Sequence, residues 1–482
     1  MNRAPGVAVS DLALVIPELI LTGAALALIL LASRMRRGNA ASVGTVVAAL
    51  AAALASAWAL PAEAETGFGG MITQDGYSGF FKILIAAALA LAALVSVPSR
   101  HESDENEEND APHAEYHALL LLASAGMMFA VSAMDLLTLY LGLELMTVCS
   151  YILVGIHVQR PASNEAAIKY FLVASFASAL LLYGISLTYG FAGGTGFTAV
   201  ASAFSERGAS ESPLLVGAIA LVLGGLAFKI AAVPFHSWAP DAYQGASAPV
   251  AAFLAAGSKA AGLAALARVT LVAYGSAAEI LSMLIAGLAA LSIVVGSITL
   301  LAQTDMKRLL AYSSITHAGY AILGLIAGTP AGISATMTYA FFYVFMTLGA
   351  FGVVIALGER GATLNGYRGL AAQRPGTAAL MLLFLLSLTG IPPTAGFVAK
   401  FVVILSAVRA GYLVLAVLAV ACSVVSAFVY MRVAVYMFMR EAEEPAPSHW
   451  PMAMSAALAV AALVTLIGGI SPATLMSWAV SP

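Results

Sequence analysis

Long apolar segments alternate with short polar connections along most of the 482 residues. A helix of about 20 apolar residues is long enough to cross the hydrocarbon core of a bilayer. With that length as a template, the pattern predicts fourteen transmembrane helices, near residues 11–33, 41–60, 78–97, 114–133, 135–157, 162–191, 213–236, 247–272, 277–301, 308–328, 333–358, 375–406, 410–437 and 450–478. The expected fold is therefore an all-α polytopic membrane protein.

The composition fits a membrane protein and excludes several functions. Hydrophobic residues make up 61% of the chain and charged residues 9%, against about 25% charged in a soluble domain. No basic patch with interleaved aromatic residues is present, so no nucleic-acid partner is expected. The two cysteines, Cys149 and Cys422, lie singly in apolar segments. They form no CxxC metal or haem motif, and we expect no metal, cofactor or redox centre within this chain.

The charges of the connections predict the orientation. Most lysines and arginines follow odd-numbered helices, whereas the opposite side holds mainly Arg3, Arg207 and Arg409. By the positive-inside rule, both termini face outward. The acidic run 101–110 then lies on the cytoplasmic side, and segment 196–207, with one apolar face, is expected to form a short interfacial helix on the outer side.

The order of the helices suggests an internal repeat. Helices four to eight and nine to thirteen form two groups of five, and an odd number of spans forces the second group to insert upside down. The fourth helix of each group contains one lysine and a proline interruption, Lys229 with Pro234 and Lys400 with Pro392-Pro393. The predicted organisation is an N-terminal three-helix segment with the acidic loop, a first repeat, an inverted second repeat and a last helix, at residues 1–110, 111–272, 273–440 and 441–482.

Glu144 and Lys229 are charged residues within apolar spans. A charge at the centre of a bilayer costs at least ~2.5–3.5 kcal/mol, so it requires a partner, water or a function. We predict that these two side chains form an ion pair that keeps both charged. Separating them would favour release of the lysine proton, so the pair would act as a proton switch. The structural alternative is a carboxylate held by local hydroxyl groups.

Further lysines lie in other spans. Lys259 and Lys400 are candidates for a proton path because burial shifts the pKa of lysine readily, although Lys259 also has a snorkelling interpretation. For Lys169, a local pair with Glu165 four residues earlier is as good an interpretation as a functional role. Lys82, near the start of its span, is expected to snorkel to the interface.

Two histidines are weaker candidates. His317, in the tenth span, is able to bridge Lys259 and Lys400, because imidazole donates and accepts protons near neutral pH. A hydrogen-bonded structural histidine explains it equally well. His236, beside the seventh-helix break, either caps freed carbonyl groups or lines a cytoplasmic entry. The eleventh span carries hydroxyl groups at helical spacing, either a face that holds water or simple helix packing, on Tyr339, Tyr343 and Thr347.

Five ordered motifs between about residues 110 and 440 show a family resemblance. They read LYLGLELMTVCSYIL, NEAAIKYFLVASFASALLLYG, FKIAAVPFHSWAPDAYQGASAPVAAFLAAGSK, DMKRLLAYSSITHAGY and LTGIPPTAGFVAKF. Together they resemble the antiporter-like membrane subunits of respiratory complex I. The resemblance implies that the proton path consists of Glu144, Lys169, Lys229, Lys259 and Lys400.

The same resemblance implies a function and partners. The chain would be a membrane subunit of a proton-translocating NADH:quinone oxidoreductase in a bacterial inner membrane. NADH, FMN, iron-sulfur clusters and quinone would be bound by partner subunits. The expected neighbours are an antiporter-like subunit M and a small subunit K.

The antiporter-like siblings differ in a few features. Subunit L typically has a long lateral helix after the fourteenth span, whereas this chain stops at Pro482, and subunit M typically has a glutamate where Lys400 stands. These differences argue against subunits L and M, and they favour the third antiporter-like subunit of the complex. Two alternatives stay open, namely an M-like sibling and a subunit of a multisubunit sodium/proton antiporter with the same fold.

Overall fold

The computed structural model describes residues 9–32, 39–61, 63–97, 113–207, 213–443, 445 and 450–473. These residues form a helical bundle with one small hairpin. The elements are α1 (Val9–Ala13), α2 (Ile16–Leu31), α3 (Ala40–Trp58), β1 (Glu65–Gly67), β2 (Ile72–Gln74), α4 (Gly76–Val95), α5 (His113–Ser132), α6 (Leu136–Val154), α7 (Pro161–Ala192), α8 (Phe197–Arg207), α9 (Pro213–Lys229), α10 (Trp238–Gly245), α11 (Ala248–Phe253), α12 (Lys259–Arg268), α13 (Ala278–Leu300), α14 (Met306–Ile322), α15 (Pro330–Ala356), α16 (Leu370–Gln373), α17 (Pro375–Thr389), α18 (Ala395–Arg409), α19 (Leu413–Met439) and α20 (Met452–Ile470). The acidic run 101–110 lies outside the described residues.

The predicted spans coincide with helices. Within the described ranges, eleven helical segments are long and apolar enough to cross a membrane, and three shorter apolar helices accompany them, Ile16–Leu31, Pro213–Lys229 and Pro375–Thr389. Each predicted segment overlaps one of these helices. The prediction of an all-α polytopic membrane protein is confirmed.

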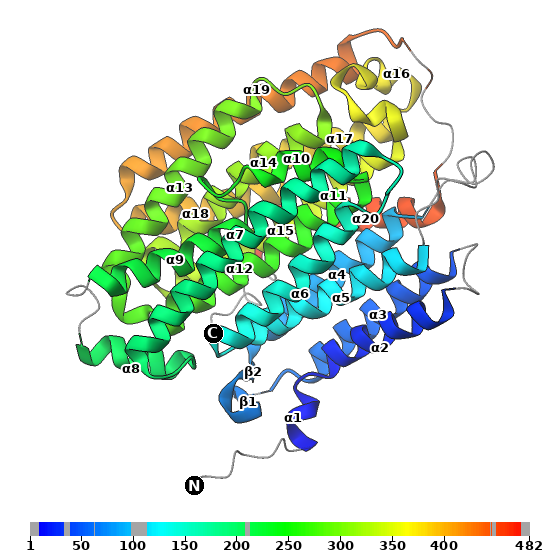
Figure 1. Ribbon diagram of the computed structural model, residues 1–482. Coiled ribbons are helices and arrows are strands. Elements are labelled where there is room, and N and C mark those ends of the chain that lie inside the picture. The colour runs from blue at the N-terminus through cyan, green and yellow to red at the C-terminus, as the bar shows by residue number, and fades with distance from the viewer. Residues whose placement is uncertain are drawn as a thin grey trace.

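The bundle has a buried centre and an apolar outer layer. The most apolar part of segment 248–273, which contains α11 and α12, is wholly buried, and that of segment 306–327, which contains α14, is 94% buried. In α3, α7 and α19, only 39% of the most apolar part of the helix is buried. Figure 1 shows α2 and α3 at one edge of the bundle and α19 at the opposite edge. The two charged side chains of α12 are therefore removed from lipid and water alike, since Lys259 is 1% exposed and Arg268 2%.

Both predicted helix breaks are present, with shifted boundaries. In the seventh span α9 ends at Lys229, five residues before Pro234, and α10 begins at Trp238. The chain turns at Ala231, whose φ of 56° is uncommon for a residue with a side chain. In the twelfth span α17 ends at Thr389 and α18 begins at Ala395.

Other local features differ from the prediction. The first predicted span is two helices, α1 and α2, because the chain is interrupted at residues 14–15. The eighth span contains two π-helical segments, Leu254–Ser258 and Val269–Ala273, on either side of α12. A hydropathy pattern does not distinguish π from α geometry, so neither segment was predictable.

The short helix predicted at 196–207 is confirmed as α8. Its apolar residues Phe197, Val200 and Phe204 are all buried. Figure 1 shows α8 at one end of the bundle, outside the layer of long helices. The helix therefore covers the ends of neighbouring spans.

Candidate functional site

The ion pair predicted between Glu144 and Lys229 is present. Lys229 Nζ lies 2.9 Å from Glu144 Oε1, and their side chains are 2% and 23% exposed. Glu144 comes from α6, and Lys229 is the last residue of α9, where the seventh span breaks. The break therefore places the ammonium group at a helix end, where the backbone no longer continues in regular hydrogen bonding.

Two hydroxyl groups complete this pair. Thr147, three residues after Glu144 on the same face of α6, accepts a hydrogen bond of 2.6 Å from Lys229 Nζ. Ser178 of α7 donates one of 2.6 Å to Glu144 Oε1. Hydrogen bonds to charged groups contribute about 1.5–3 kcal/mol each, so these contacts offset part of the cost of burying the charges. Neither hydroxyl was predicted as part of the site.

Lys259 lies on the adjacent α12 and points toward α14. It is 1% exposed, and its Nζ donates a hydrogen bond of 2.6 Å to the carbonyl oxygen of Ser314. The snorkelling interpretation of Lys259 is therefore wrong. Gly262, one turn later, brings α12 close to the break, since a Cβ atom there would lie 2.8 Å from Ile230 Cγ2.

Lys400 is buried at the second helix break. Its Nζ donates to the carbonyl oxygen of Thr389, the last residue of α17, at 2.8 Å and to Ser423 Oγ at 2.9 Å. The ammonium group also lies 4.6 Å from the ring centre of Tyr320. Gly390 has a φ of 89°, and a Cβ atom there would lie 2.9 Å from Lys400 Cδ. The glycine provides both the turn and the space for the lysine.

Both of these lysines contact α14. Ser314, His317 and Tyr320 follow one another at three-residue spacing, so they lie along the same side of the helix. Ser314 binds Lys259, Tyr320 lies beneath Lys400, and His317 stands between them. His317 Nδ1 lies 2.6 Å from the hydroxyl of Tyr339 on α15. His317 thus hydrogen-bonds a tyrosine, and its role as a bridge between the lysines stays a prediction.

Lys169 and His236 lie apart from the buried line. The side chain of Lys169 is 50% exposed and pairs with Glu165 at 2.7 Å and with Asp241 at 3.5 Å. The local pair with Glu165 is therefore present, and Lys169 is not brought to Glu144. His236 is half-buried at the seventh-helix break, and its Nδ1 has no hydrogen-bond partner among the described residues.

A second buried ion pair was not predicted. Lys82 does not snorkel: its side chain and that of Glu18 are both fully buried, with 2.9 Å between Nζ and Oε1. Lys82 also donates to Gln74 Oε1 at 2.9 Å and to the carbonyl of Leu14, at the interruption between α1 and α2, at 3.1 Å. Glu18 is 64 residues earlier in the chain than Lys82. The position of Lys82 along its own helix therefore gives no indication of this pairing.

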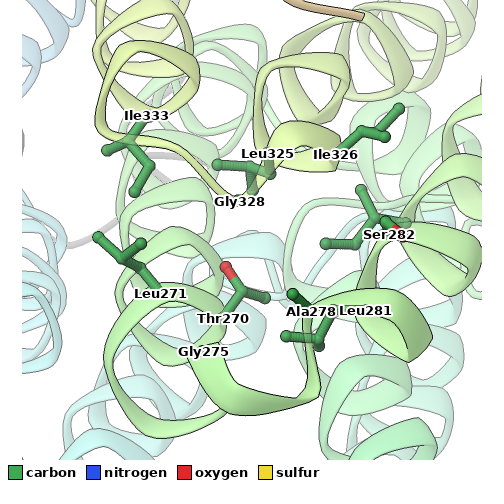
Figure 2. A pocket seen from close by; sticks show the side chains of 11 residues that line it. Thr270, Leu271, Gly275, Ala278, Leu281, Ser282, Leu325, Ile326, Gly328 and Ile333 are labelled. Atoms are coloured by element: carbon green, nitrogen blue, oxygen red, sulfur yellow. The ribbon is translucent and has the colours of Figure 1, made fainter. Parts of the chain in front are cut away.

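A small cavity lies away from the lysines, where the π-helical segment after α12 meets the start of α15 (Figure 2). Its volume is about 30 Å³, enough for one or two water molecules. The lining is mainly apolar, and Thr270 and Ser282 contribute hydroxyl groups. In the part of the chain that the structure describes, no cluster of three or more His, Cys, Asp or Glu residues suits a metal ion.

Comparison with known proteins places this arrangement in a family. The family model for the NADH:quinone oxidoreductase/Mrp antiporter transmembrane region matches residues 133–426. NADH-quinone oxidoreductase subunit N of Desulfovibrio desulfuricans is 42% identical over 492 aligned residues, which cover 97% of this chain and 96% of that protein.

Two solved structures have the same fold. A chain of respiratory complex I from Thermus thermophilus matches with a TM-score of 0.81 and 33% identity, over 96% of this chain and 99% of that one. A chain of the Mrp complex from a Dietzia species has a TM-score of 0.81 at 22% identity, over 97% of this chain and 96% of that one, which shows a shared fold. The chain therefore belongs to the NADH:quinone oxidoreductase/Mrp antiporter membrane family, and within it to the group of NADH-quinone oxidoreductase subunit N.

Proposed function

We propose that this chain is the proton-translocating subunit N of a bacterial complex I. The observation that carries the proposal is a set of three buried lysines, Lys229, Lys259 and Lys400, the first of them paired with Glu144. A buried charge without a function is expensive in a membrane, and these three lysines lie on the central and broken helices. NADH oxidation and quinone reduction would be carried out by other subunits, which would bind NADH, FMN, iron-sulfur clusters and quinone.

The geometry suggests how protons move. While Glu144 lies 2.9 Å from Lys229, the carboxylate holds the lysine in its charged form. A change in the charge around Glu144, which is 23% exposed at the surface of this chain, would weaken the pair. Desolvation would then favour release of a proton from Lys229 toward Lys259. Glu144 acts as the switch, and Lys229 as the group that loads and releases the proton.

The face of α14 provides the next step. Lys259 and Lys400 would exchange protons through His317 and water. The hydroxyl groups of Ser314, Thr347 and Tyr243 are buried and have no hydrogen-bond partner among the described residues. Buried polar groups of this kind are usual binding places for ordered water. Lys400 would finally pass the proton toward the outer side.

Several finer features belong to the same proposal. The chain would contain two inverted five-helix repeats, at 111–272 and 273–440, with both termini outward. Glu144 would face a neighbouring subunit such as small subunit K, and subunit M would adjoin the opposite side. The neighbours' own charges would set the state of Glu144. The two broken helices, each with a buried lysine beside the break, support the repeat.

The test is proton uptake into inverted membrane vesicles energised with NADH, measured with the NADH:quinone reductase rate. In Lys229→Ala, at matched amounts of assembled complex, we expect both to fall together, because the pump and the redox reaction are coupled. Lys169→Ala is the matched control, since it removes a lysine that is half-exposed and locally paired. Full retention of both activities in the assembled Lys229→Ala complex would refute the proposal.

A second candidate is a subunit of a sodium/proton antiporter driven by ion gradients alone. The fold shared with the Dietzia Mrp complex favours it, and the buried charges fit either function. The vesicle experiment separates the two. If Lys229→Ala leaves the NADH-driven activities unchanged and abolishes sodium-driven proton exchange, the antiporter function is correct.

A further inference from the structure

A charged cluster closes the end of α12 that lies away from the seventh-helix break. Arg268, the last residue of α12, is 2% exposed and makes two hydrogen bonds, of 2.8 and 2.9 Å, to the carboxylate of Asp75. Its guanidinium group lies 4.6 Å from the ring centre of Tyr77. Burial alone raises the pKa of Asp75, but the hydrogen bonds and charge of Arg268 outweigh it and lower the pKa below its ordinary value. The pair is therefore ionised at neutral pH.

This cluster lies at the opposite end of α12 from Lys259, the end that faces outward in the predicted orientation. Arg268 is nine positions after Lys259, or roughly 13 Å along the helix axis. The residues between them, 260–267, are all alanine, glycine or leucine and are buried. The hydroxyl of Tyr77 donates to the carbonyl of Ala264 at 2.8 Å, so α4 covers this stretch. In this direction α12 presents no polar side chain between the lysine and the arginine.

Two residues beyond Arg268, the chain no longer packs fully against its neighbours and borders a cavity. Thr270 and Leu271 line the cavity of Figure 2, which has room for water. Along the chain, Arg268 therefore stands between a cavity with room for water and the apolar stretch that leads back to Lys259. Sideways, by contrast, Lys259 already binds the carbonyl of Ser314 on α14.

We propose that the Asp75–Arg268 pair, with Tyr77 and the apolar stretch 260–267, is a seal that stops protons on Lys259 from leaving outward through the first half of the protein. Arginine remains charged under all relevant conditions, and a fixed positive charge repels protons in a narrow path. The seal makes transfer along α14 to Lys400 the available route. This inference rests on the proposed function, and Arg268 acts by positioning the barrier and does not itself carry the proton.

The test measures proton leak without NADH. Inverted vesicles containing the assembled complex are given an imposed pH gradient, and its decay is followed for the unaltered protein and Arg268→Ala. Removing the side chain leaves a cavity beside the buried Asp75 carboxylate, which water enters. We expect the leak to rise severalfold and NADH-driven proton accumulation to fall, while the uncoupled NADH:quinone rate is kept. Adding Lys259→Met to Arg268→Ala should return the leak to its original level.

Two further variants separate a seal from a structural contact. Arg268→Lys keeps the contact with Asp75, but a buried lysine is able to release its proton, so this variant should leak more than the unaltered protein. Asp75→Leu with Arg268→Met fills the space with apolar groups and should stay tight. An assembled Arg268→Ala complex with an unchanged leak would overturn the inference. If neither Arg268→Ala nor Arg268→Gln assembles, the pair serves to hold α4 and α12 together, which also overturns it. Because the leak is measured without NADH, failure here differs from failure of Lys229→Ala to lower pumping.

Discussion

The ion pair between Glu18 and Lys82 gives a prediction whose size follows from burial. Both side chains are 0% exposed, so the substitution Lys82→Met leaves the Glu18 carboxylate enclosed without its counter-charge. Removing one partner of a buried pair costs about 3–5 kcal/mol. Since 1.4 kcal/mol corresponds to a factor of ten, the equilibrium between folded and unfolded subunit shifts by roughly two to three and a half orders of magnitude.

The matching double variant tests the cause of that loss. Glu18→Leu combined with Lys82→Met replaces both charges by apolar side chains of similar size. Such replacements are often neutral or stabilising, so the double variant should recover most of the stability that the single variant loses. The other two acceptors of Lys82, Gln74 and the carbonyl of Leu14, then lose their donor, and we expect recovery to stop short of the unaltered protein by about 1–3 kcal/mol.

The assay is the amount of assembled complex in membranes and its rate of dissociation on heating in mild detergent. Lys82→Met should lower the amount of assembled complex and raise its rate of dissociation, and the double variant should lie between the single variant and the unaltered protein. A Lys82→Met variant as stable as the unaltered protein would refute the reasoning, because a snorkelling lysine would behave in that way. A stable Lys82→Met complex with impaired pumping would instead place the pair in the proton path.

Three more predictions concern the path itself. Gly390→Ala should at least halve NADH-driven proton uptake, because a side chain at a φ of 89° is strained and its Cβ meets Lys400 Cδ at 2.9 Å; uptake equal to the unaltered protein at matched assembly would contradict this. Thr147→Val removes the hydroxyl that binds Lys229 at 2.6 Å and should slow NADH:quinone turnover about tenfold or more, with rescue by Thr147→Ser. Lys169→Ala should keep most of both activities, because exposed ion pairs contribute about 1 kcal/mol or less; a loss as large as in Lys229→Ala would show that Lys169 belongs to the path.

Hydropathy predicted the fold well because the bilayer leaves few alternatives. Every backbone polar group in hydrocarbon must be satisfied within its own helix, so each long apolar segment had to be helical. The cost of a charged side chain in hydrocarbon predicted the Glu144–Lys229 pair, since each residue was a charge in an apolar span and needed a partner. Prolines marked both breaks, but the start of the first break at Lys229 depends on local backbone geometry at Ala231.

The contacts that sequence reasoning missed are all between distant segments. Lys82 was expected to snorkel because its depth in one helix was the only information available, and Glu18 lies on another helix. The same holds for Asp75 and Arg268, which are 193 residues apart. The position of a residue along its helix indicates its depth in the membrane, whereas its partner depends on how the helices pack.

Packing also favours α14 over α12 as the connection between the lysines in the proposed path. Along α12, the residues after Lys259 are alanine, glycine and leucine until Arg268. The next charged side chain on this helix is therefore at its far end. On α14, Ser314, His317 and Tyr320 form a polar row within a helix that is almost wholly buried. A proton on Lys259 therefore has polar neighbours across the bundle and apolar ones along its own helix. Under the proposed function, that difference favours lateral transfer through the centre of the protein over transfer along α12.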